Sequence, residues 1–207
     1  MSARDEDLLL RWSAGDARAG NALVARHFAS VYRFVRAKLD EGVDDLVQQT
    51  FLGLVEGASR VRDATSFKAY LFAIARRQLL LFWRKQRRAN KVFSPGEASV
   101  ISLAVAPDTS PSRVAARRSV RRRVVEALRA LPIDFQIVIE LFYWENMGVH
   151  EIAAVVEVPT GTVKSRLARA RSQLEAALQD ARDDPPPDVE ARLRAARPSA
   201  PPPRRRS

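Results

Sequence analysis

Apolar residues recur at three- and four-residue intervals along much of the chain, which is the spacing of helices that bury one face. The pattern predicts helices within residues 5–40, 44–58 and 66–88. It stops in a segment rich in Pro, Ser and Ala and then resumes over residues 117–180. We therefore expect an all-α protein in which two small helical domains are joined by a flexible linker.

The same breaks in the pattern give the domain boundaries. We expect a first helical domain at residues 1–88, a linker at 89–116, a second helical domain at 117–180 and a tail at 181–207. Seven of the twelve prolines lie in the tail, so we expect it to be mostly disordered, with at most a short helix at 189–196. Non-specific DNA affinity and a passive role both remain open for it.

A tight bend between two helices is predicted within residues 151–171. Pro159 disfavours helix at the residue before it, and Thr160 is placed to cap the next helix. That helix has an apolar seam at helical spacing, formed by Val163, Leu167, Ala170, Leu174 and Leu178. Basic residues lie largely off the seam, which is typical of a helix-turn-helix whose second helix enters the DNA major groove. The alternative is an ordinary helical hairpin with a solvated charged face.

The charge balance favours a nucleic-acid partner. A formal net charge of +11 and a pI of about 11.0 predict a polyanionic partner, nucleic acid before membrane surface. The chain has no cysteine, hence no disulfide and no thiolate metal site, and we assign no metal, cofactor or catalytic residue. It has no apolar run of membrane-spanning length and no signal-peptide pattern, so we expect a cytoplasmic protein without membrane insertion.

The predicted helix at 66–88 combines positive charge with aromatic residues. Its expected inner face consists of Phe67, Tyr70, Leu71, Ile74, Gln78, Leu81 and Phe82. Its C-terminal half is basic, and the interleaved aromatic residues are Phe72, Phe82 and Trp83. Cations that follow phosphates and rings that stack on bases suit single-stranded nucleic acid. The alternative is that the aromatic residues belong to the core.

For the helix at 44–58, the expected apolar face is Leu46, Val47, Phe51, Leu54 and Val55.

Three motifs in this order resemble the RNA polymerase sigma factors of the extracytoplasmic-function type, which keep only the second and fourth conserved regions. The first is VDDLVQQTFLGL, which is similar to the family's core-docking helix. The second is SFKAYLFAIARRQLLLFWRKQRR, similar to the helix that contacts the minus-ten element. The third runs from ALRALPIDF to RLARAR and is similar to the fourth region, which ends in the minus-thirty-five helix-turn-helix.

The resemblance implies three sets of binding residues. The set matching the core-polymerase surface is Asp44, Asp45, Val47, Gln48, Gln49 and Leu52. The set matching the minus-ten contacts, including a loop that captures a flipped base, is Val61, Arg62, Asp63, Ala64, Thr65, Ser66, Ile74, Ala75, Arg76, Arg77, Arg84, Arg87 and Arg88. The set matching the minus-thirty-five contacts is Thr160, Thr162, Lys164, Ser165, Arg166 and Arg169.

The family resemblance therefore implies a sigma factor that directs core RNA polymerase to promoters and aids DNA opening. Its implied partners are the core enzyme, promoter DNA in duplex and single-stranded form, and an anti-sigma factor. The chain departs from the family pattern at Gln49, where Glu is usual, and at Gly148, where a helix-capping Ser is usual. A stand-alone helix-turn-helix regulator is the runner-up. A nucleic-acid-processing enzyme is disfavoured, because no phosphate loop, Cys/His cluster or nucleophile–base pair is visible.

Overall fold

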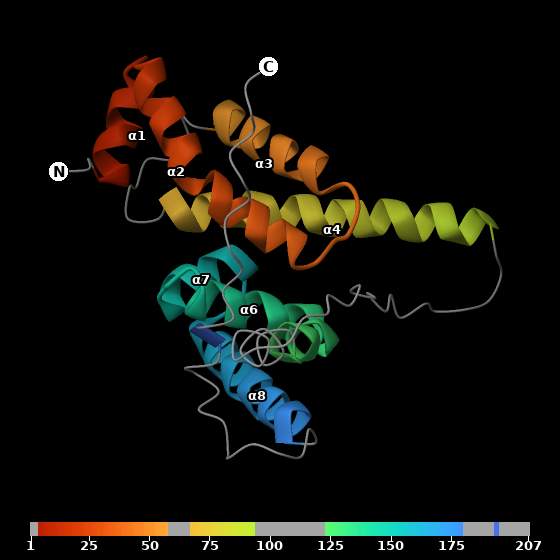
Figure 1. Ribbon diagram of the computed structural model, residues 1–207. Helices are drawn as coiled ribbons and strands as arrows, with labels where there is room; N and C mark the ends of the chain where they lie inside the picture. The colour runs from red at the N-terminus through yellow and green to blue at the C-terminus, as the bar shows by residue number, and fades with distance from the viewer. Residues whose placement is uncertain (1–3, 58–66, 94–122, 180–192, 195–207) are drawn as a thin grey trace, which may run out of the picture. The chain divides into compact units, whose positions relative to one another are not determined.

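The computed structural model describes residues 4–57, 67–93, 123–179 and 193–194, with only the helical backbone at 89–93. Every regular element in these ranges is an α-helix (Figure 1), which confirms the all-α prediction for the described residues. The chain divides into two compact units, one built around α1 to α4 and the other around residues 123–131 and α6 to α8. None of the described helices is both long and apolar enough to cross a membrane.

Turn residues explain where the second and third helices of the N-terminal unit begin. The unit contains α1 (Asp5–Ser13), α2 (Ala17–Arg36), α3 (Val43–Gly57) and α4 (Phe67–Phe93). Gly15 (φ 95°) precedes α2 and Gly42 (φ 72°) precedes α3, both in the left-handed conformation that glycine adopts most readily. The carboxylate of Asp16 caps α2 by accepting hydrogen bonds from the backbone N–H groups of Arg18 (2.9 Å) and Ala19 (3.2 Å).

The core of this unit contains large apolar side chains of α2, α3 and α4. Leu23, Phe34, Leu54, Phe72 and Leu79 are all essentially inaccessible to solvent. Phe34 and Phe72 meet edge to face with ring centroids 5.2 Å apart, which is a favoured aromatic geometry. Complete burial of a side chain of this size contributes about 1.5–3 kcal/mol, so these contacts hold α4 against the rest of the unit.

Two expected core faces differ from those observed. On α4 the sequence predicted an inward Leu81, but this side chain is 45% exposed, while Phe72 and Leu79 are buried. Apolar residues occur almost all round this part of α4, so their spacing alone did not fix which side faces inward. On α3, Val55 was expected in the core and is instead 56% exposed.

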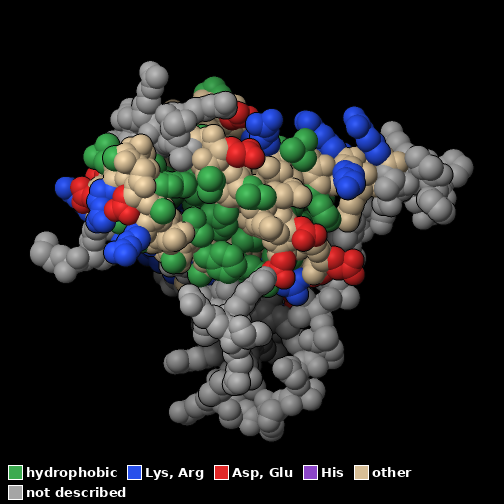
Figure 2. Space-filling view, turned by 90° about the horizontal axis from the view of Figure 1, so that it is seen from above, with side chains coloured by type: hydrophobic (Ala, Val, Ile, Leu, Met, Phe, Trp, Pro, Cys, Tyr) green, Lys and Arg blue, Asp and Glu red, His purple; other side chains and the backbone are tan. Residues whose placement is uncertain are grey.

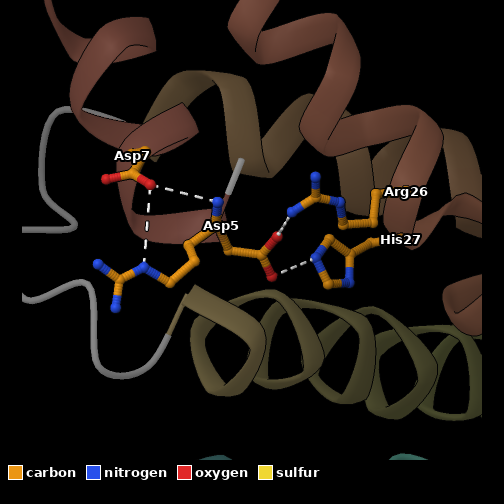
Figure 3. A network of polar contacts seen from close by, with 5 residues as sticks. Asp5, Asp7, Arg26 and His27 are labelled. Carbon is orange, nitrogen blue, oxygen red and sulfur yellow. Dashed lines mark hydrogen bonds and ion pairs between the residues drawn. The ribbon is translucent and has the colours of Figure 1, made fainter. Parts of the chain in front are cut away.

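A polar network and one close packing contact join α1 to α2. Asp5 accepts from Arg26 through one carboxylate oxygen, and its Oδ2 lies 2.7 Å from Nε2 of the buried His27 (Figure 3). Elsewhere on the same interface, Trp12 lies against Gly20. A Cβ at position 20 would be 2.6 Å from the indole Nε1, so only glycine permits this approach.

The C-terminal unit consists of short helices around a strongly apolar one. Its elements are helical residues 123–130, α6 (Ile133–Tyr143), α7 (Val149–Val156) and α8 (Thr160–Gln179). α6 is a helix rather than a strand, and Ile137, Val138, Ile139 and Leu141 are buried on it. The predicted seam of α8 is confirmed, because all five of its residues are buried.

Gly148 precedes α7, and its N–H donates to Oε2 of Glu151 (2.7 Å). A glycine therefore suffices at this helix start.

The bend between α7 and α8 differs from the prediction in one respect. α7 ends at Val156, and Glu157 adopts a left-handed conformation (φ 56°). Thr160 is not the N-cap but the first helical residue. The carbonyl of Pro159 accepts the first backbone hydrogen bonds of α8, a shift of one residue that is common at helix ends.

Candidate protein- and nucleic-acid-binding surfaces

The outer side of α3 presents a mixed apolar and polar surface. We call it the α3 surface; its exposed residues are Asp44, Asp45, Gln48, Gln49, Leu52 and Val55. Leu52 is 53% exposed and Val55 is 56% exposed, and Figure 2 shows apolar side chains gathered on the face of the N-terminal unit seen from above. Val47 was predicted to belong to this set, but it is only 2% exposed and faces the core.

The opposite side of α3 is fixed by packing. Leu46, Phe51 and Leu54 are buried, and Phe51 stacks on Phe28 with ring centroids 6.0 Å apart. The buried hydroxyl of Thr50 donates to the carbonyl of Leu46 (2.8 Å), so the polar atom it brings into the core is satisfied. The α3 surface is therefore carried by a helix that is held in place before any partner binds.

An open, polar pocket of about 420 Å³ lies at the start of α3. It is lined by Tyr32, Arg36, Asp40, Gly42, Val43, Asp44 and Asp45. The Arg36 guanidinium donates to the carbonyls of Leu39 and Asp40, both at 3.0 Å, and lies 3.3 Å from the Asp40 carboxylate. Within the described ranges, no three His, Cys, Asp or Glu side chains converge as metal ligands. The pocket is best regarded as the acidic end of the α3 surface.

The predicted minus-ten residues on α4 fall into two groups. Ala75 is fully buried, and Ile74 and Arg76 are half-buried, so they belong largely to the body of the unit. Arg77, Arg84, Arg87 and Arg88 are exposed, and so is Lys85. The predicted loop residues 61–66 lie outside the described residues. α4 thus exposes Arg77 near its middle and a group of four cations at residues 84–88 in its C-terminal half.

The aromatic residues of α4 are also divided. Phe72 is fully buried against Phe34 and is a core residue. Phe82 and Trp83 are partly exposed, close to the cations in sequence. The alternative that the rings belong to the core therefore holds for Phe72, whereas Phe82, which lies against Gly42, and Trp83 are only partly buried.

The N-terminal turns of α8 present polar and basic side chains to solvent. Lys164, Ser165 and Arg169 are exposed, and Thr160 and Thr162 are half-buried. The Ser165 hydroxyl donates to the carbonyl of Thr162 (2.9 Å). The buried seam on the other side of α8 fixes the direction in which these side chains point. This is the arrangement that a helix needs in order to enter a DNA groove.

Arg166 differs from its neighbours because it is already paired. Its Nη2 lies 3.0 Å from Oδ2 of Asp134 on α6, and its side chain is 22% exposed. Arg171, further along α8, lies with its guanidinium carbon 5.6 Å from the ring centroid of Phe142 and 5.5 Å from that of Tyr143. Sequence reasoning did not find either contact, because each joins residues that are far apart in the chain.

The comparison with known families decides how these surfaces are to be understood. The pattern described as sigma-70 region 2 matches residues 23–89, and that described as sigma-70, region 4 matches residues 121–174. The two matches together cover more than half of the chain and include α3, α6, α7 and most of α4 and α8. The chain belongs to the sigma-70 family.

Curated relatives place this sigma factor with the extracytoplasmic-function type. The ECF RNA polymerase sigma-E factors of Salmonella typhimurium (strain LT2) and Escherichia coli (strain K12) are each 27% identical over 180 residues, covering 84% of this chain and 94% of the relative. The RNA polymerase sigma-H factor of Pseudomonas aeruginosa is 27% identical over 184 residues, covering 85% of this chain and 94% of the relative.

Solved structures of similar proteins agree with this placement. CnrH, solved in complex with the cytosolic domain of CnrY, gives a TM-score of 0.59 at 28% identity and covers 86% of this chain and 99% of its own. The sigma factor RpoE of Bartonella quintana, solved with the anti-sigma factor NepR, gives a TM-score of 0.60 at 26% identity and covers 81% of this chain and 99% of its own.

Proposed function

We propose that this sigma factor divides its binding of core polymerase and of promoter DNA among three surfaces. As a sigma factor, it directs bacterial RNA polymerase core enzyme to promoters and aids DNA opening. In the proposal, the α3 surface binds the core enzyme, the basic half of α4 holds the opened minus-ten strand, and α8 reads the minus-thirty-five duplex. The observation that supports it most directly is the half-exposed pair Leu52 and Val55 beside the polar residues of α3.

The α3 surface suits a protein partner rather than DNA. Its apolar pair lies among uncharged glutamines and follows Asp44 and Asp45 in the first turn of the helix. Carboxylates at this end would repel phosphates and attract basic residues of a protein. A central apolar contact with a polar rim is the usual composition of a protein–protein interface. The buried Val47 would support this surface from inside without touching the partner.

On α8, exposed side chains on the first turns would reach base edges in the major groove. Arginine and lysine can donate to guanine there, and each well-made contact contributes roughly 1–3 kcal/mol of discrimination. Lys164, Ser165 and Arg169 are the described residues best exposed for this purpose. Phosphate contacts from other cations would add affinity that falls steeply with salt.

On α4, the exposed cations would follow the phosphates of a separated strand, and the partly exposed rings of Phe82 and Trp83 would stack on its bases. The flipped base itself would be captured by residues 61–66, as the family resemblance implies. Removing one base from the stack costs a few kcal/mol, and a fitting pocket offsets part of that cost.

The test is transcription from defined promoters with core enzyme reconstituted with this protein. Wild-type protein should produce discrete start sites that core enzyme alone does not, and Arg169→Ala should reduce use of promoters selected by their upstream element. Arg18→Ala, an exposed arginine on α2 outside all three surfaces, is the matched control and should behave as wild type. Start sites identical to those of core enzyme alone would contradict the proposal.

Other aspects of function follow from the same proposal. Because CnrH and RpoE were solved with CnrY and the anti-sigma factor NepR respectively, we expect an anti-sigma factor to bind this protein as well. The chain would act in the cytoplasm, where polymerase and DNA are, and would leave all bond chemistry to polymerase. A stand-alone regulator is not favoured, because the region 2 match gives the N-terminal unit a role that such a protein does not need.

A further inference from the structure

Two residues near the end of the sequence pack against the C-terminal unit. Leu193 and Arg194 are helical and lie beyond the region 4 match, which ends at residue 174 (the short dark-blue piece in Figure 1). Leu193 is 0% exposed, although its sequence neighbourhood is rich in Pro, Ala and Arg. A fully buried leucine in such surroundings indicates that a particular site receives it.

The site lies at the C-terminal end of α6. Trp144 directly follows α6 and is 3% exposed, and its indole Nε1 donates to the carbonyl of Leu193 at 2.7 Å. A buried indole N–H without an acceptor is costly, and the carbonyl of Leu193 supplies the acceptor for the indole N–H of Trp144. The contact therefore combines an apolar side chain with a directed hydrogen bond.

A second residue of the segment adds to the contact. The guanidinium carbon of Arg194 lies 5.9 Å from the ring centroid of Tyr143, the residue that ends α6 and is 4% exposed. A cation at this distance from an aromatic ring is attracted to it. Leu193 and Arg194 thus bind two adjacent aromatic residues of α6 by different interactions.

The sequence after Leu178 contains few residues that could be buried against the domain. After Leu178, Val189 and Leu193 are the only large aliphatic residues in the chain. The remaining sequence offers the domain almost nothing else to bury, so a docked segment has to use one of these two. The structure assigns that role to Leu193.

We propose that the end of α6, at Tyr143 and Trp144, is a binding site for a leucine-bearing segment, and that residues 193–194 of the same chain are its occupant. The tether keeps the segment at a high effective concentration, so the site is filled without any partner. A partner that uses this surface must first displace Leu193. The assignment does not depend on the DNA-binding role of α8.

The test follows the tryptophan indole N–H groups of the full chain by NMR, with Trp144 identified among the three tryptophans by Trp144→Phe. Leu193→Asp places a charge in the apolar site and should shift the Trp144 indole signal alone, with its hydrogen exchange at least about tenfold faster. Leu193→Met, which keeps the volume and the apolar character, should leave both unchanged. Trp12 and Trp83 serve as internal references.

Two results would overturn the proposal. A Trp144 signal and exchange rate that are the same in Leu193→Asp and wild type would show that the segment does not occupy the site. Mixing labelled Leu193→Asp with unlabelled wild type tests whether the segment comes from a second copy, and recovery of the wild-type Trp144 signal would exclude the same-chain assignment. Unchanged helical circular dichroism in Leu193→Asp shows that the domain remains folded during both measurements.

Discussion

The strongest prediction concerns the energy that Leu52 and Val55 contribute to binding core polymerase. Full burial of an aliphatic side chain of this size contributes about 1.5–3 kcal/mol. Since roughly half of each side chain is exposed before binding, docking has about 1 kcal/mol to gain at each position. The double variant Leu52→Ala/Val55→Ala should therefore lose about 2 kcal/mol, which raises the Kd for core enzyme about 30-fold. Leu52→Arg should weaken binding at least as much as Leu52→Ala, because it adds a charge to the apolar contact.

The assay is a titration of core enzyme with fluorescently labelled protein, with thermal unfolding measured in parallel. Exposed substitutions usually change the free energy of unfolding by no more than about 0.5 kcal/mol, so the double variant should melt as wild type does. Leu10→Ala is the matched control, because Leu10 is 66% exposed on α1, outside the α3 surface. A Kd within about twofold of wild type for the double variant, or an equal loss for Leu10→Ala, would refute the reasoning.

Three further predictions concern the N-terminal unit. Gly20→Ala should destabilise the contact between α1 and α2 by about 1–3 kcal/mol, because the added Cβ overlaps the Trp12 ring. Chemical denaturation followed by tryptophan fluorescence measures this loss, and an unchanged denaturation curve would contradict the prediction. The side-chain hydrogen bond from Arg11, followed by backbone hydrogen bonds at the start of α2, holds the pKa of Asp16 below its ordinary value of 3.8. The stabilisation by this carboxylate should thus be complete above pH 3.8 and be lost as pH falls through the lowered pKa, so Asp16→Ala should lower the melting temperature near neutral pH but not in strong acid. Phe72→Ala should cost about 3–5 kcal/mol of unfolding free energy by circular dichroism, whereas a surface ring that only stacks on DNA would show no such loss.

Local signals in the sequence were sufficient for most helix positions and for the face of α8. Gly15, Gly42 and Pro159 interrupt the pattern where the chain turns, and the apolar seam of α8 has no competing set of apolar residues on that helix. The exposed basic positions on the first turns of α8 follow from that seam. The inward side of α4 was harder to predict, because the run LLLFW leaves several sides equally apolar.

Contacts between distant segments were beyond the reach of local patterns. The pairing of Arg166 with Asp134 depends on how α8 crosses α6, which no spacing within either helix reveals. Val189 and Leu193 have helical spacing and allowed a short helix to be expected there, but two apolar residues do not reveal which surface receives them. Val55 matched the helical spacing of its buried neighbours but lies at the edge of that face, where burial depends on the neighbouring helix.

The ion pair between Arg166 and Asp134 has a consequence for the ionic-strength dependence of promoter binding. A free arginine that reaches a phosphate displaces a condensed counterion, which makes binding weaker as salt rises. Arg166 already has an anion at 3.0 Å, so reaching a phosphate would require it to exchange one negative partner for another. The carboxylate left behind would then recruit a cation from solution, which offsets the counterion released from the DNA. A plot of log affinity against log salt should therefore be steeper for Asp134→Asn than for the wild-type chain.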